Sequence, residues 1–228
     1  GMSALTANTT GAENTVVGSQ AMEDNTTGSS NTVLGKSALA NNTTASNNVA
    51  IGHGTMFDNT TGTSNTAIGY TALGDNTTAS NNTAVGYLAL RLNTTGSENT
   101  AVGTSALDAN TTGGNNTAVG HNALTANTTA ANNTAFGKST LQSVTTGSAN
   151  TGLGKEAGGA ITTGDFNTFV GAAGFATTTA SANTGVGYNA MATNTTGDDN
   201  VAVGRQAMLL NTTGGNNVSV GSFSLDAN

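Results

Sequence analysis

The hydrophobic and polar positions of this chain follow a fixed repeat. An Asn recurs every 17 residues, with one step of 16, from Asn14 to Asn217, and opens thirteen units with the consensus N-T-A-V-G-x-x-A-L-x-x-N-T-T-G-x-x. We number the positions of this repeat 0 to 16 from that Asn. A period of this length is too short for a pair of helices and is typical of one coil of a β-solenoid. The pattern therefore predicts an all-β fold, a parallel β-roll or β-solenoid of thirteen 17-residue coils.

Large and small apolar residues occupy separate positions of the repeat. Position 3 is aliphatic or Phe throughout, and position 8 is Leu, Met or Phe except at Gly158, so we expect these two positions to form the core. Positions 2 and 7, mostly Ala, are expected to form a close seam between subunits. Position 4 is Gly in every unit, which predicts a corner where φ is positive or the backbones approach too closely for a Cβ.

The polar positions predict turns and ladders. Asn-Thr-Thr-Gly/Ala at positions 11 to 14 combines β-favouring Thr with turn-forming Asn and Gly, so we expect a short strand entering a turn there and two or three strands in each coil. Stacked Asn residues can hydrogen-bond side chain to side chain from coil to coil.

Composition narrows the function classes. Only 7% of the residues are charged, the net charge is −7, and Pro, Cys and Trp are absent. Without a basic run, nucleic acid is not an expected partner, and no apolar stretch approaches the roughly 20 residues needed for membrane insertion. Two His residues and scattered carboxylates form no catalytic, cofactor-binding or metal-ligating set, so we predict no enzyme, no cofactor and no metal.

The repeat also defines the expected domain organisation. Residues 4–228 are predicted to form a single repeat domain with irregular coils at 150–183, and residues 1–3 are a cloning remnant or part of a repeat. Neither end carries a polar capping sequence, so we expect a piece of a longer chain. Two large apolar side chains per coil make a thin core, which favours a homo-oligomer.

The units at 65–73 (NTAIGYTAL) and 82–90 (NTAVGYLAL), each followed by Asn-Thr-Thr, resemble repeats of large bacterial and phage fibre proteins. These include the mosaic adhesive trimer fibres of predatory bacteria, tail-fibre proteins with a C-terminal intramolecular chaperone, and trimeric autotransporter adhesin heads. The resemblance implies a left-handed homotrimer at a cell surface or on a virion tail fibre, used in attachment.

Two regions are candidate binding sites. Position 5 contains the Tyr and His residues and most of the cations. This pattern predicts an exposed stripe that binds glycans or anionic envelope polymers. The alternative is that an outward-facing corner accommodates large side chains without any binding function. The stripe comprises Lys36, His53, Tyr70, Tyr87, His121, Lys138, Lys155, Tyr188 and Arg205. The irregular coils form either a binding region or a packing adjustment, and their candidate residues are Asp165, Phe166 and Phe169.

The predicted function is a structural or adhesive segment of a surface-exposed trimeric fibre that mediates attachment. Two alternatives remain open. One is an ice-binding solenoid that uses the Thr rows at positions 12 and 13, of which only one can face solvent because adjacent strand residues point to opposite sides. The other is a passive spacer that presents a separate tip domain.

Overall fold

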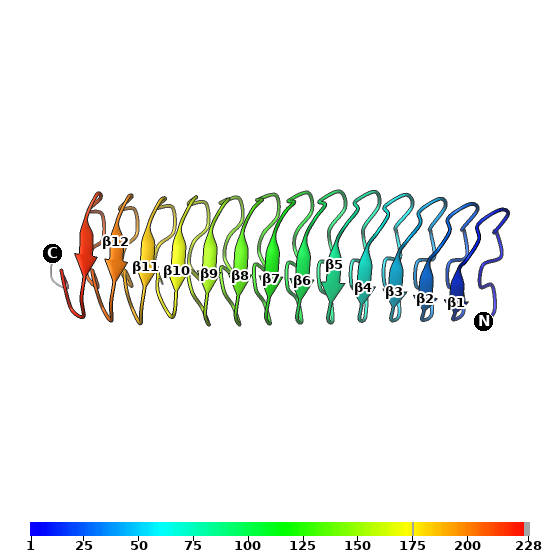
Figure 1. Cartoon of the computed structure of the whole chain (residues 1–228), viewed down its shortest axis with the longest axis horizontal. Coiled ribbons are helices and arrows are strands. Elements are labelled where there is room, and N and C mark those ends of the chain that lie inside the picture. The colour runs from blue at the N-terminus through cyan, green and yellow to red at the C-terminus, as the bar shows by residue number, and fades with distance from the viewer. Residues whose placement is uncertain (175, 226–228) are drawn as a thin grey trace. The chain divides into compact units, whose positions relative to one another are not determined.

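The computed structural model describes residues 1–174 and 176–225, which divide into two compact units, 1–115 and 116–228. No helix occurs in these described residues, and thirteen parallel strands, one per coil, form the predicted β-solenoid (Figure 1). The strands are β1 Thr15–Val17, β2 Thr32–Leu34, β3 Val49–Ile51, β4 Thr66–Ile68, β5 Thr83–Val85, β6 Thr100–Val102, β7 Thr117–Val119, β8 Thr134–Phe136, β9 Thr151–Leu153, β10 Thr168–Val170, β11 Thr184–Val186, β12 Val201–Val203 and β13 Val218–Val220.

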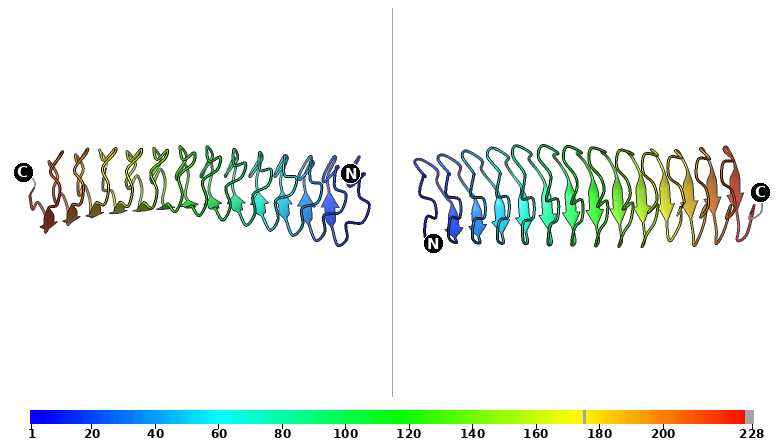
Figure 2. Two further views of the ribbon diagram at one scale, coloured as in Figure 1. Left: turned by 90° about the horizontal axis from the view of Figure 1, so that it is seen from above. Right: turned by 180° about the vertical axis from the view of Figure 1, so that it is seen from behind.

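Each strand covers positions 1 to 3 and pairs in register with the strand of the next coil of its unit. In the first unit Thr15 pairs with Thr32, and in the second Thr117 pairs with Thr134. Within each unit the strands lie along one side of the coils, as Figure 2 shows. The register keeps identical positions of successive coils above one another, as the strict period predicts.

The expectation of two or three strands per coil is wrong. At positions 12 and 13 the amides of Thr26 and Thr27 both donate to the carbonyl oxygen of Thr43, at 2.9 and 3.2 Å. Two consecutive amides that share one acceptor make a bend, because successive amides of a strand point in opposite directions. The Thr pairs therefore lie in a hydrogen-bonded bend outside the sheet.

The core of a regular coil contains one of the two predicted rows of large side chains. The prediction that position 3 belongs to the core is wrong. Position 8 is buried as predicted, with Leu39 and Leu73 at 0% exposure, but position 3 points out of the coil, where Leu34 is 50% exposed. The residue that points inward from each strand is the small one at position 2, for example Ala67. A strand of three residues turns only its central side chain to the inside, because its flanking neighbours face the other way.

The Ala seam between subunits is also contradicted. Ala at positions 2 and 7 is fully buried within its own coil, as Ala67 and Ala72 are at 0% exposure. These methyl groups fill the space beside the position-8 side chain, so they cannot touch another chain. The small residues serve the close packing of one solenoid.

The corner at position 4 has both features expected of it. Gly69 has a φ of 135°, and a Cβ on it would lie 2.4 Å from the carbonyl oxygen of Gly86 in the next coil. Such a contact is far inside van der Waals distance, so a side chain would separate the coils. Position 8 also has positive φ, with Leu73 at 53°, a conformation that L-residues adopt rarely.

Two buried Asn rows complete the core. At position 11, Asn76 donates from Nδ2 to Oδ1 of Asn59 in the preceding coil at 2.7 Å and to the carbonyl oxygen of Ala79 at 3.0 Å. At position 0, the backbone amide of Asn65 donates to Oδ1 of Asn48 at 2.9 Å. The predicted Asn ladders are confirmed, and they satisfy backbone groups that so thin a coil would otherwise bury unpaired.

Candidate binding surface

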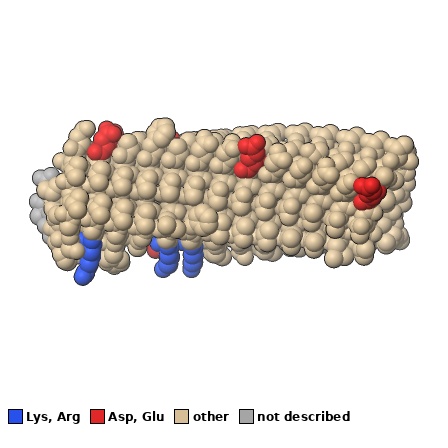
Figure 3. Space-filling model, viewed as in Figure 1, with Lys and Arg blue, Asp and Glu red and all other residues tan. Residues whose placement is uncertain are grey.

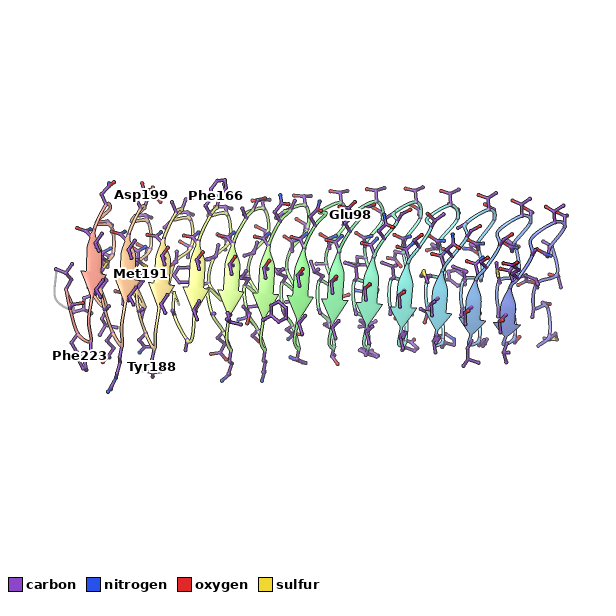
Figure 4. All side chains as sticks on the ribbon, in the orientation of Figure 1. Glu98, Phe166, Tyr188, Met191, Asp199 and Phe223 are labelled. Atoms are coloured by element: carbon purple, nitrogen blue, oxygen red, sulfur yellow. The ribbon has the colours of Figure 1, made fainter. Side chains whose placement is uncertain are left out.

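All nine side chains of the predicted position-5 stripe are exposed. They follow the Gly corner, so they project from the edge of the coil where the strand ends. Figure 4 shows Tyr188 at this edge, and Phe166 and Asp199 of the same unit at the opposite edge. On the face seen in Figure 3 the basic side chains project from one edge, which agrees with the clustering of cations at position 5.

The stripe is organised differently in the two units. In the first unit three successive coils stack their rings: the centroids of His53 and Tyr70 are 5.4 Å apart, and those of Tyr70 and Tyr87 are 5.5 Å apart, with interplanar angles of 9° and 15°. In the second unit Tyr188 lies between Ala172 and Arg205, and the guanidinium of Arg205 lies 5.3 Å from the ring centroid of Phe223. The first unit therefore presents a continuous aromatic strip.

Two hollows adjoin this strip. The larger, about 500 Å³, is lined by side chains and backbone of Ser37, His53, Gly54, Phe57, Tyr70, Thr71, Gly74, Asp75, Leu88 and Arg91. The smaller, about 440 Å³, is lined by Gln20, Glu23, Asp24, Lys36, Ser37, Ala40, Asn41, His53 and Phe57. Both include Ser37, His53 and Phe57, so the hollows are neighbours that share one wall. We call them together the aromatic groove.

Sequence reasoning missed the wall of the groove that faces the aromatic strip. Phe57, Gly74 and Arg91 occupy position 9 of three successive coils and line the larger hollow together with the position-5 residues His53 and Tyr70. The signal was present, because Gly54 and Gly74 interrupt positions that carry side chains in most other coils. Two missing side chains beside bulky neighbours leave the space that the groove occupies.

Charged groups at the groove are coupled. Arg91 donates from Nε to Oδ1 of Asp108 at 2.9 Å, and this hydrogen bond raises the pKa of the Arg91 guanidinium. Burial raises the pKa of the Asp75 carboxyl, and the neighbouring Asp58 raises it further, whereas Arg91 lowers it. Asp75 thus contributes a partly desolvated carboxyl group to the groove.

In the irregular coils, one of the three candidate binding residues is buried. Phe169 is 0% exposed and fills the core, so its assignment to a binding site is wrong. Its ring occupies space left by glycines: a Cβ on Gly174 or on Gly185 would lie 2.6 or 2.7 Å from it. Phe166 is 69% exposed, and Asp165 accepts a hydrogen bond from the amide of Ser148 at 2.6 Å. The structure thus favours a packing adjustment, although Phe175 of this stretch lies outside the described residues.

The Thr rows differ in what their hydroxyls do. At position 12 the hydroxyl of Thr60 donates to the carbonyl oxygen of Thr77 at 3.0 Å, and the same contact recurs along both units. At position 13 the side chains are exposed, as at Thr61 and Thr78. One Thr row, and not two, is open to solvent.

Other kinds of site are not evident in the described residues. Among residues 1–174 and 176–225 no three His, Asp or Glu side chains come together in a way that could hold a metal ion. The same residues include no helix with the length and apolar character needed to cross a membrane.

The fold defines the chain as a parallel β-solenoid repeat protein. No family model matches it, and comparison with curated proteins and with solved structures found no match.

Proposed function

We propose that this chain is a structural and adhesive segment of a surface-displayed fibre, assembled from copies of itself and without enzymatic activity. The observation that carries the proposal is the row of large apolar side chains at position 3, which the strands present to solvent. Members of the row at least one third exposed are Val17, Leu34, Ile68, Phe136, Leu153, Val203 and Val220.

An outward apolar row of this kind favours assembly. Soluble monomers rarely expose contiguous apolar patches beyond a few hundred Å². Position 1 beside it is Thr or Val, so the strand face carries no charge at positions 1 and 3 of any coil. Packing these faces together would remove apolar surface from water at about 25 cal/mol per Å². The resemblance to trimeric fibre adhesins adds two features to this proposal: an assembly of three copies and a left-handed roll.

The adhesive part of the proposal rests on position 5. Its side chains leave the coil beyond the Gly corner, so covering the strand face would leave them accessible. Repetition places a similar edge on every coil, which suits attachment to an extended target such as a cell envelope. We propose an extracellular location, at a cell surface or on a virion tail fibre, on the same grounds.

Oligomeric state tests the proposal directly. Light scattering of the parent chain is expected to give three times the mass of one chain, 22.1 kDa. Replacing Ile68 and Val102 by Lys is expected to dissociate the assembly, because charges would be buried at the interface. A monomeric parent chain would contradict the proposal.

A matched control is available at the exposed Thr row. Thr78→Lys with Thr112→Lys has the same spacing along the stack but lies at position 13. This variant is expected to keep the parent mass. Dissociation of both variants would indicate charge repulsion in general and would count against an interface at position 3.

Ice binding is the second candidate, favoured by the exposed Thr row at position 13. Because the position-12 hydroxyls are bonded to backbone carbonyls, the surface is a single row of hydroxyls rather than a flat double row. A thermal-hysteresis assay separates the candidates. Activity in that assay from a monomeric chain would replace the fibre proposal, whereas an assembled chain that binds no cell would leave the spacer alternative.

A further inference from the structure

The aromatic groove of the first unit provides a defined site on an otherwise repetitive surface. It spans five successive coils, from Gln20 to Arg91, and unlike the stripe as a whole it is lined by side chains of positions 5 and 9 together. One wall contains His53 and Tyr70 of position 5, and the stacked ring of Tyr87 continues this strip in the next coil. The other wall contains Phe57 and Arg91 of position 9. Thr71 of position 6 also lines the groove.

The walls offer apolar surface on both sides. Tyr70 is 49% and Phe57 is 41% exposed, so their rings are open to a ligand. The offset rings of the strip continue the apolar surface over three coils, at centroid steps of 5.4 and 5.5 Å. Such a surface suits the C–H faces of pyranose rings, which are apolar, while the hydroxyl groups at the ring edges remain free for hydrogen bonds.

Polar groups converge on the same space. The buried hydroxyl oxygen of Thr71 has no hydrogen-bond partner among the described residues. The Nε–Oδ1 contact with Asp108 fixes the Arg91 guanidinium, whose terminal nitrogens make no hydrogen bond to another described residue. The Asp75 carboxylate can accept two hydroxyl hydrogen bonds. A few donors and acceptors beside aromatic walls make up the usual composition of a small-ligand site.

The charged side chains of the groove favour a neutral saccharide over an anionic one. Glu23, Asp24 and Asp75 line it against Lys36 and Arg91, and Arg91 is already paired with Asp108. The chain as a whole carries a net charge of −7. A sulfated or carboxylated polymer would meet net repulsion, whereas a neutral sugar would not.

We propose that the aromatic groove binds a neutral oligosaccharide, with pyranose rings against the His53–Tyr70–Tyr87 strip and hydroxyls bonded to Asp75 and Arg91. This proposal specifies a ligand class for the proposed adhesive function and rests on that function. It is narrower than the sequence prediction, since it places binding in one groove of the first unit instead of along the whole stripe.

The experiment is calorimetric titration of the intact chain with three probes of equal length: a neutral glucose oligomer, an N-acetylglucosamine oligomer and a sulfated oligosaccharide. Binding of at least one neutral probe and weaker or absent binding of the sulfated one is expected. Tyr70→Ala and Phe57→Ala should each weaken binding about tenfold or more, in the range found for anchoring aromatic residues.

Phe223→Ala is the matched control, because Phe223 is an exposed aromatic side chain, at 50%, that lies in the second unit outside both the groove and the position-5 stripe. It should leave binding unchanged. Absence of binding to both neutral probes, stronger binding of the sulfated probe, or equal losses in the control would overturn the proposal. Light scattering of the same samples measures the assembly of the chain separately. A chain that assembles but binds no sugar would contradict the proposed sugar site and leave the fibre proposal intact.

Discussion

The regular coils of the first unit and the irregular coils around Phe169 in the second build the same narrow core in different ways. In a regular coil the strand contributes Ala, such as Ala67, and position 8 contributes Leu, such as Leu73. In the irregular coils the sizes are exchanged: Phe169 points inward from β10, while position 8 of the preceding coil is Gly158. The comparison shows that the stack conserves internal volume, and that either side of the coil can supply it.

The polar rows show the same difference. Position 11 is Asn in every coil of the first unit, from Asn8 to Asn110, but Val144, Ile161 and Thr177 replace it in three successive coils of the second. Val144 and Ile161 are 0% exposed. Apolar residues can thus replace Asn in part of the row, and where the replacement ends the buried hydroxyl of Thr177 has no hydrogen-bond partner among the described residues.

The largest expected effect is at the Gly corner. Gly69→Ala should lower the free energy of unfolding by about 5 kcal/mol or prevent folding, because its Cβ would lie 2.4 Å from a carbonyl oxygen at a φ of 135°. At the same position of the irregular coil, a Cβ on Gly171 would lie 3.4 Å from the nearest oxygen. Gly171→Ala should therefore cost much less. Denaturant titration of both variants measures the difference, and equal losses would mean that contact distance is not the cause.

The next effect concerns the exchange of core volume. Phe169→Ala should cost about 3–5 kcal/mol, because it leaves a cavity among glycines. Adding Gly158→Leu should recover part of that loss, since Leu at position 8 adopts positive φ throughout the regular coils and Gly158 has a φ of 60°. The double variant resembles a regular coil. Denaturant midpoints test this, and a double variant less stable than Phe169→Ala would refute the exchange.

A smaller effect is expected in the Asn row. Asn76→Val should cost about 2–3 kcal/mol, because it removes two hydrogen bonds donated by Asn76 and leaves the Nδ2 donor of Asn93 without its 3.1 Å contact to Asn76. Ile161→Asn in the second unit should also destabilise, since neither of its neighbours in the row, Val144 and Thr177, carries a side-chain amide to pair with it. A neutral result for either substitution would show that the rows tolerate mixing, contrary to the comparison.

The smallest effect is a pH dependence confined to the first unit. Because burial and Asp58 raise the pKa of Asp75 above its ordinary 3.8, the folded chain holds this proton more tightly than the unfolded chain. The stability contributed by Asp75 is therefore greatest below the ordinary pKa and falls as pH rises through the raised value. Asp75→Asn should leave stability at low pH nearly unchanged and increase it slightly at neutral pH. Thermal unfolding against pH measures this, with Ser143→Asn, at the same position in the second unit, as a control without pH dependence.

Parts of the fold and site could be predicted because they depend on neighbours related by the repeat. The period places like residues above one another, which predicted the ladder of Asn76 on Asn59 and the corner at Gly69. The position-5 stripe could be found because its residues share one position. Phe57 and Arg91 were missed because they join the site across the coil, and a repeat consensus carries no information on which positions face each other.

The sequence by itself determined the coil length, the Gly corner and the stacked Asn rows, since each follows from a residue type repeated at fixed spacing. Only the tertiary structure decided which side of the strand faces inward. A strand of three residues carries too little alternation to distinguish its faces, and size suggested that Leu34 is buried and Ala67 is exposed. The opposite holds, because the space enclosed by a 17-residue coil admits one large side chain, and position 8 already fills it.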